Sequence, residues 1–128
     1  MVTETLVTPL IDSGSEIIDQ CRKDNFSIEL AFWLKVVDDE NWYLYLVTNT
    51  MAQDGPRKTY NKLYASWNKL ENPFVSYSDI KLIDTTDSLA KSVKELAEQY
   101  GRQLNTWFGK KLLGSLEAEK MFIYRIDK

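Results

Sequence analysis

The stretch that decides the fold is Ile28-Glu29-Leu30-Ala31-Phe32-Trp33-Leu34-Lys35-Val36. Its even-numbered positions are all apolar, which is the two-residue period of a β-strand with one apolar face. A polar connection at 38–41 separates this run from a second run at 42–48, which is rich in aromatic and β-branched residues. The two runs predict an antiparallel hairpin. We expect Phe32 to face helices and Trp33 to emerge on the opposite face of the sheet.

Three helices are predicted around this hairpin from apolar positions at helical spacing. The first begins at Thr8-Pro9, where a capping hydroxyl residue precedes a proline suited to the first turn, and ends near Asn25. The second begins at residues 54–56, with the sequence Asp-Gly-Pro, and the third is capped by Thr86 or Asp87. The apolar stripe of the second helix is unusually aromatic and consists of Tyr60, Leu63, Tyr64, Trp67 and Leu70.

Three further strands are predicted at about 79–83, 104–108 and 119–126, because each run is rich in apolar or β-branched residues. Every apolar helix face needs a partner surface, so the most economical arrangement is a sheet with helices packed against it. The predicted fold is a single α+β domain over residues 1–128, with residues 1–7 as a candidate disordered tail. It has an antiparallel or mixed sheet of about five strands, three helices on one face, and the order α-β-β-α-β-α-β-β.

Composition narrows the functional classes. Hydrophobic residues make up 44% of the 128-residue chain and the net charge is −3, so one ordinary core is expected and no positive field would gather polyanions. A single cysteine, Cys21, cannot form an internal disulfide, which suits a reducing compartment. The first eight residues lack a basic flank and a long apolar stretch, and no run reaches the roughly 20 apolar residues of a membrane span. We therefore expect a cytoplasmic protein that does not enter membranes.

Several short motifs occur in an order that resembles a family of small uncharacterised bacterial proteins. These motifs are Ala31-Phe32-Trp33-Leu34, Trp42, Asp54-Gly55-Pro56-Arg57, Tyr60, Asp79-Ile80 and Ile123-Tyr124-Arg125-Ile126. The resemblance covers roughly residues 10–126 and implies a bacterial cytosolic origin and the same order of elements. Because the family has no assigned activity, the resemblance implies no catalytic residue. The sequence departs from the family's pattern between Tyr100 and Gly114.

The residue inventory excludes the commonest catalytic arrangements. The chain has no histidine and one cysteine, which rules out the usual zinc sites and catalytic triads. Carboxylate chemistry at 38–40 remains open, although acidic residues in such a turn are normally solvated. Cys21 continues the apolar stripe of the first helix, so a buried thiol is favoured over a nucleophile. No P-loop or dinucleotide fingerprint is present. We predict no catalytic residue, metal or cofactor, and lean towards a non-enzymatic protein.

Three candidate binding sites remain, and the leading one is an interaction surface for a protein partner or a second copy. It consists of Trp33, Trp42, Tyr43 and Tyr45. If Trp33 lies on the face without helices, cross-strand pairing places the other aromatic residues of the hairpin near it. The alternative is that loops or the N-terminal segment cover this face.

The two other candidates are a small-molecule or anion site and a nucleic-acid site. The first is a pocket near the start of the second helix, lined by Arg57, Tyr60 and Tyr64, where the helix N-terminus and a forked cation would hold an anion. Pro56 and Asp54 count against it, because one removes a donor and the other adds a negative charge. The nucleic-acid candidate combines cations with an aromatic ring and consists of Arg102, Trp107, Lys110 and Lys111. The alternative for these residues is a solvated hairpin tip.

Overall fold

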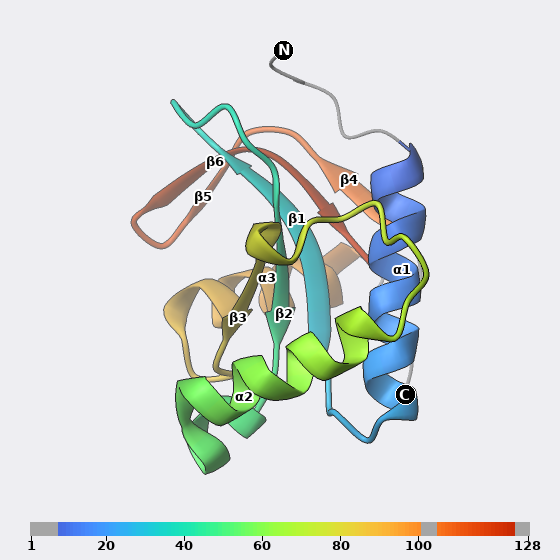
Figure 1. Ribbon diagram of the computed structural model, residues 1–128. Coiled ribbons are helices and arrows are strands. Elements are labelled where there is room, and N and C mark those ends of the chain that lie inside the picture. Colours follow the sequence, from blue (N-terminus) through green and yellow to red (C-terminus); the bar gives the residue numbers. More distant parts are fainter. Residues whose placement is uncertain (1–7, 101–104, 125–128) are drawn as a thin grey trace.

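The computed structural model describes residues 8–100 and 105–124 (Figure 1). Its elements are α1 (Thr8–Lys23), β1 (Leu30–Val36), β2 (Tyr43–Val47), α2 (Thr50–Asn68), the 3₁₀ helix η1 (Tyr77–Asp79), β3 (Ile80–Ile83), α3 (Ser88–Tyr100), β4 (Thr106–Phe108), β5 (Lys111–Leu113) and β6 (Leu116–Ile123). The strands form one mixed sheet in the order β3-β2-β1-β6-β4, with β5 beside β6. The predicted α+β class and the order of the elements are confirmed. The additional strand is β5, which was expected to be a basic loop.

The strand β1 is central to the sheet. It pairs antiparallel with β2, as the hairpin predicted, and antiparallel with β6 on its other side. Phe32 lies opposite Tyr45 in β2 and opposite Ile123 in β6. The strand β3 pairs parallel with β2, because α2 carries the chain back along the sheet before β3 begins.

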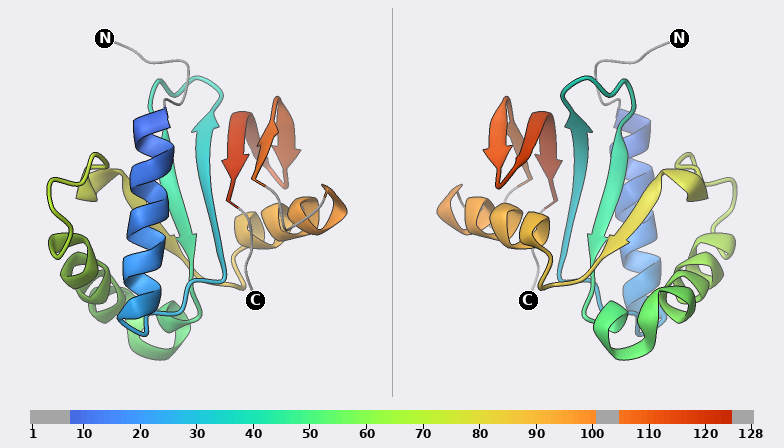
Figure 2. Two further views of the ribbon diagram at one scale, coloured as in Figure 1. Left: turned by 90° about the vertical axis from the view of Figure 1, so that its right-hand side faces the viewer. Right: turned by 90° about the vertical axis from the view of Figure 1, so that its left-hand side faces the viewer.

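Helices cover both faces of this sheet (Figure 2). The helices α1 and α2 pack on the face that carries Trp33, and α3 packs on the face that carries Phe32. The prediction that all three helices lie on one face was therefore wrong. The physical reason lies in β1, whose odd positions Ala31 and Trp33 are as apolar as its even ones, so both of its faces need cover.

The single charged residue of β1, Lys35, is buried and is reached by a carboxylate from β6. Its Nζ lies 3.4 Å from Oε2 of Glu119. Lys35 pairs with Lys120 and Val36 pairs with Ala118, so Glu119 is an extra residue in β6 at this point. Such a β-bulge redirects a side chain, and here it accompanies the ion pair that compensates the buried ammonium.

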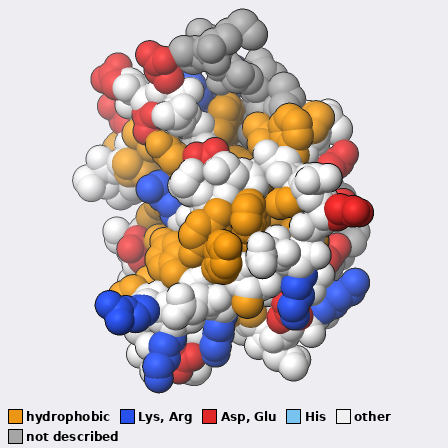
Figure 3. Space-filling view, in the orientation of Figure 1, with side chains coloured by type: hydrophobic (Ala, Val, Ile, Leu, Met, Phe, Trp, Pro, Cys, Tyr) orange, Lys and Arg blue, Asp and Glu red, His pale blue; other side chains and the backbone are white. Residues whose placement is uncertain are grey.

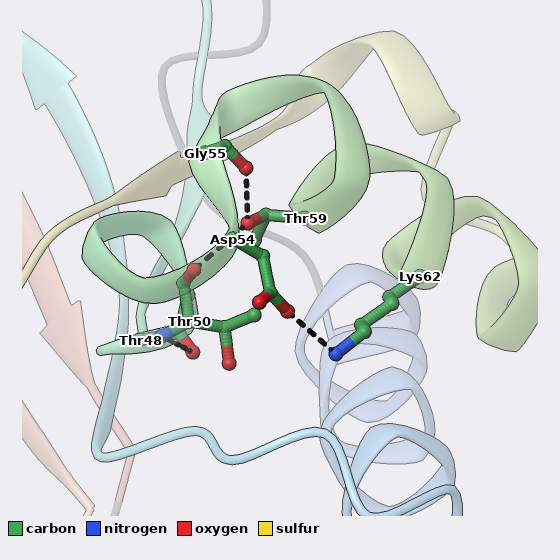
Figure 4. A network of polar contacts seen from close by, with 6 residues as sticks. All are labelled: Thr48, Thr50, Asp54, Gly55, Thr59 and Lys62. Atoms are coloured by element: carbon green, nitrogen blue, oxygen red, sulfur yellow. Dashed lines mark hydrogen bonds and ion pairs between the residues drawn. The ribbon is translucent and has the colours of Figure 1, made fainter.

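The helix α2 begins at Thr50 and is interrupted at Gly55, within the segment 54–56 where the sequence predicted its start. Gly55 has φ 84° and ψ 166°, a conformation that glycine adopts without strain, and Pro56 follows it in the second part of the helix. The hydroxyl of Thr59 donates to the carbonyl oxygens of Thr50 and Gly55, at 3.2 and 2.6 Å, and so ties the two parts together (Figure 4). A further turn, 50–54, thus precedes the predicted start.

Candidate functional site

The predicted interaction surface on the sheet is not exposed. Trp33 is 1% exposed and Trp42 is 6% exposed, because α1 and α2 cover the face that carries them. Nε1 of Trp33 donates to Oη of Tyr124 at 2.8 Å, and that hydroxyl donates in turn to the carbonyl of Ile11 in α1 at 2.7 Å. The expectation that Trp33 emerges from the sheet was therefore wrong, and this tryptophan belongs to the core.

The two tyrosines of that predicted surface lie on the other face and are half-buried. Tyr45 stacks on Phe32 with ring centroids 5.2 Å apart. Nζ of Lys81 lies 4.6 Å from the ring centroid of Tyr43, which is cation–π geometry. Tyr43 and Tyr45 thus do not share a surface with Trp33 and Trp42.

A group of partly exposed aromatic side chains lies on α2 and η1. We define the aromatic patch as Tyr60, Tyr64 and Trp67 of α2 together with Tyr77 of η1. Tyr64 is 48% exposed, and its ring centroid lies 6.0 Å from Trp67 and 5.3 Å from Tyr77. Trp67 and Tyr77 are 5.8 Å apart, so these three rings contact one another. Hydrophobic side chains gather over α2 and the segment leading into β3 in a space-filling view (Figure 3).

The polar atoms of the aromatic patch are largely satisfied within the protein. Nε1 of Trp67 donates to the carbonyl of Val75 at 2.9 Å, and the hydroxyl of Tyr77 donates to the carbonyl of Tyr60 at 3.1 Å. The hydroxyl of Tyr60 accepts a hydrogen bond from the backbone N–H of Leu82 at 3.0 Å. Burial raises the pKa of Tyr77, so its hydroxyl stays neutral. The aromatic patch therefore presents ring surface and few unpaired donors.

The same residues close one edge of the sheet. In β3 the carbonyl of Ile83 points towards β2, where it accepts from the N–H of Thr48, so Ile80 and Leu82 direct their N–H groups outwards. Leu82 is capped by the hydroxyl of Tyr60, and the N–H of Ile80 donates to the carbonyl of Tyr77. With both outward donors occupied, an added strand from another chain is disfavoured at this edge.

The basic residues near the aromatic patch differ in whether they form ion pairs. Lys62 of α2 pairs with Asp54 at 2.9 Å (Figure 4). Lys69, directly after α2, pairs at 2.8 Å with Asp24, directly after α1. Arg57 is exposed and forms no ion pair within 8–100 and 105–124. Of the predicted small-molecule residues, the structure thus brings Tyr60 and Tyr64 into the aromatic patch and leaves Arg57 in solvent two helical turns before Tyr64. Anion binding there stays a prediction.

Two of the predicted nucleic-acid residues, Trp107 and Lys111, contact core residues on opposite faces of the sheet. Trp107 is 48% exposed and packs on Phe122, 4.9 Å away, on the side of α1 and α2. Nζ of Lys111 lies 5.9 Å from the ring of Phe108, which belongs to the core on the α3 side. The exposed Lys110 lies in the turn between β4 and β5. Arg102 falls outside the described residues. A strand of nucleic acid stacked on Trp107 would therefore not meet Lys111 on the same face.

A polar hollow of about 280 Å³ runs beside α1, but none of the predicted site residues lines it. Its lining includes Asp12, Ser15, Asp19 and Arg22. Arg22 is held by a hydrogen bond to the carbonyl of Ile28 at 3.3 Å. The hollow is lined by two carboxylates, Asp12 and Asp19, and by the guanidinium of Arg22, which already donates a hydrogen bond within the protein. This mixed lining favours neither an anionic nor a cationic ligand.

The structure offers little catalytic chemistry among its described residues. Within 8–100 and 105–124 there is no group of three or more His, Cys, Asp or Glu side chains that could hold a metal ion. Cys21 is fully buried, and desolvation raises the pKa of its thiol to about 12, although a hydrogen bond with Ser66 acts in the opposite direction. A nucleophilic cysteine requires a thiolate near neutral pH. The predicted buried thiol is confirmed.

Alkylation of Cys21 tests this description. With a pKa about three units above the ordinary value, the thiolate fraction at pH 8 falls by about a thousandfold, and burial also blocks access. We expect iodoacetamide to leave the native protein unlabelled for hours and to label it at an ordinary rate in concentrated urea. A Ser115→Cys substitution in the exposed turn before β6 is the control and should react quickly in the native state. Equal rates at the two cysteines in native protein would contradict the structure.

Comparison with known proteins does not supply a function. No protein-family model, no curated protein and no solved structure matches the chain. The resemblance to a family of small bacterial proteins therefore stays a prediction. Among the described residues, no helix has both the length and the apolar character needed to cross a bilayer.

Proposed function

We propose that this chain is a non-enzymatic protein-binding module and that the aromatic patch of α2 and η1 is its contact surface. The observation that carries the proposal is a group of contacting rings at the surface, in which Tyr64 is half exposed and touches both Trp67 and Tyr77. Exposed apolar surface of this kind is uncommon on small soluble domains away from interaction sites. Tryptophan and tyrosine are also the residue types that contribute most to binding free energy at protein interfaces.

The hydrogen bonds inside the aromatic patch favour a protein partner over a small polar ligand. Sites for small ligands place a few unpaired polar groups in a concave pocket to fix the ligand's orientation. Here the polar atoms of Tyr60, Trp67 and Tyr77 already have partners within the chain. A partner would therefore contact carbon-rich ring surface, which suits a protein surface with apolar side chains.

The aromatic patch is also held in place before any partner arrives. Trp67 and Tyr77 are each fixed by a hydrogen bond to backbone and by contact with the other rings. Side chains that are already ordered lose less conformational entropy when they enter an interface, which favours binding. Phe74 lies next to Val75, the residue that anchors Trp67, and at 62% exposed it adds apolar surface on the same segment.

A cytoplasmic setting fits this module. The buried thiol of Cys21 and the lack of any other cysteine suit a reducing compartment, and the resemblance noted from the sequence implies a bacterial cytosol. In such a setting the partner would be another soluble protein or a second copy of the chain.

Site-specific photo-crosslinking tests the proposal. Replacing Tyr64 with p-benzoylphenylalanine puts a reactive ring of similar shape at the centre of the contacts, and we expect protein-sized adducts after irradiation in cells. Once the crosslinked protein is purified, Tyr64→Ala should weaken its binding by at least about fivefold, since truncating a buried aromatic contact costs more than about 1 kcal/mol.

The matched control carries the same crosslinker at Lys94, an exposed position of α3 on the opposite side of the sheet. Adducts at position 64 that are missing at position 94, together with weaker binding by Tyr64→Ala, would support the proposal. No adduct at position 64, equal yields at both positions, or unchanged binding by Tyr64→Ala would overturn it.

A further inference from the structure

The hollow beside α1 contains opposite charges that do not pair with each other. Asp12, Asp19 and Arg22 all line it. Their spacings of seven and three residues place them on one side of the helix. A carboxylate and a guanidinium three residues apart on a helix are neighbours that attract each other. Among the described residues, however, neither Asp12 nor Asp19 forms an ion pair.

The guanidinium of Arg22 is held at the end of α1 by the backbone that follows. Its Nη2 donates to the carbonyl oxygen of Ile28 at 3.3 Å, two residues before β1 begins. This hydrogen bond occupies one of the five N–H donors of an arginine, so donors remain for a ligand. Arg22 is therefore positioned in advance, and a gap between its charge and that of Asp19 is left open to the hollow.

The floor of the hollow is apolar. Ile18 and Tyr124 line it and are 5% and 7% exposed, and Ile11 lines it beside them. The hydroxyl of Tyr124 is engaged with Trp33 and with the carbonyl of Ile11, so this residue offers its ring to a ligand. Burial raises the pKa of Tyr124 and the negative charge of Asp12 adds to this effect, so the Asp12 carboxylate lies near the ring.

We propose that this hollow binds a free α-amino acid with an aliphatic side chain, its ammonium group on Asp19 and its carboxylate on Arg22. Both charged groups of such a ligand are bonded to one carbon atom, and Asp19 and Arg22 are about 4.5 Å apart along the helix axis. A ligand with one charge would leave the other protein charge unpaired. The volume of about 280 Å³ lies at the lower end of the range for small-molecule sites.

Nuclear magnetic resonance titration of the whole chain with L-leucine tests the proposal. Saturable shifts are expected at the backbone amides of residues 11–22 and 124, which line the hollow or lie between its lining residues. A ligand with so few atoms in an open hollow should have a dissociation constant of roughly 1 mM, so titration to about 20 mM covers the transition.

Two analogues of leucine separate the contributions of its charges. 3-Methylbutylamine keeps the side chain and the ammonium group, and 4-methylpentanoate keeps the side chain and the carboxylate. Each should bind at least about tenfold more weakly than leucine, because one charge-assisted contact is lost. Equal binding of the amine and leucine would mean that the hollow only attracts cations, and would overturn the proposal.

Variants of α1 complete the design. Asp19→Asn and Arg22→Gln should each raise the dissociation constant for leucine by at least about fivefold. Glu16→Gln is the matched control, because Glu16 is an exposed carboxylate of the same helix that does not line the hollow. No saturable shift, or unchanged binding by Asp19→Asn, would overturn the proposal. Tyr64 does not line the hollow either, so Tyr64→Ala should leave leucine binding unchanged, and failure here leaves the proposed function standing.

Discussion

Replacing Trp33 with alanine is expected to lower the free energy of unfolding by about 3–5 kcal/mol, as is replacing Phe32. Both side chains are fully enclosed, one by α1 and α2 and the other by α3, and each truncation leaves a cavity that the packed neighbours can fill only in part. Loss of this size is a large share of the stability of a single domain. Similar losses of unfolding free energy at Phe32 and Trp33, which are neighbours on opposite faces of β1, are expected only if helices cover both faces of the sheet.

A second tryptophan provides the matched control. Trp107 is half exposed on β4, so Trp107→Ala removes less buried surface and should cost about 1–2 kcal/mol. Urea denaturation followed by far-ultraviolet circular dichroism measures all three variants without depending on the number of fluorophores. If Trp33→Ala leaves too little folded protein, Trp33→Phe is the milder test. A Trp33→Ala penalty no larger than that of Trp107→Ala would contradict the two-sided core.

Most elements of this fold were predictable because each depends on local pattern, whereas β5 and the first turn of α2 were not predicted. The alternation in β1 located the hairpin. A helix cap at Thr86 or Asp87 was expected at the start of α3, and in the structure Oδ1 of Asp87 accepts from the N–H of Leu89 at 2.9 Å. The prediction that all three helices pack on the face of Phe32 was wrong, because the two-residue period of a strand shows that a face is apolar but not which helix covers it. The presence of Ala31 and Trp33 on the odd positions was the available signal, since a strand with two apolar faces is usually buried on both.

The aromatic patch could be predicted only in part. The stripe on α2 already contained Tyr60, Tyr64 and Trp67, but helical spacing alone does not show which of these rings the rest of the protein covers. Tyr77 belongs to no periodic run, and it joins the patch because η1 and the parallel pairing of β3 bring it back against α2. Such contacts depend on the order of strands in the sheet, which no local pattern specifies.

Replacing Gly14 with alanine is expected to lower the free energy of unfolding by about 2–4 kcal/mol, despite the gain in helix propensity. Alanine normally stabilises a helix interior by about 1 kcal/mol relative to glycine. At this position, however, the added Cβ would collide with Oη of Tyr124 and lie 3.1 Å from its Cζ and 3.2 Å from Nε1 of Trp33. Tyr124 cannot move aside cheaply, because it is buried and hydrogen-bonded to both Trp33 and Ile11. Overpacking and a broken buried hydrogen bond then outweigh the helix propensity.

A double-mutant cycle with Tyr124→Phe identifies the collision as the cause. Tyr124→Phe alone should cost about 1–3 kcal/mol, because it leaves the buried indole N–H of Trp33 without an acceptor. Tyr124→Phe also removes the oxygen with which the added Cβ of Gly14→Ala would collide. The double variant should therefore lose less unfolding free energy than the sum of the two single variants, by at least about 1 kcal/mol. Gly109→Ala, where an added Cβ meets no atom within 4 Å, should change stability by less than about 0.5 kcal/mol. Additive penalties in the cycle would mean that α1 does not pack on the Tyr124 hydroxyl, and the contact between the first helix and the last strand would have to be redrawn.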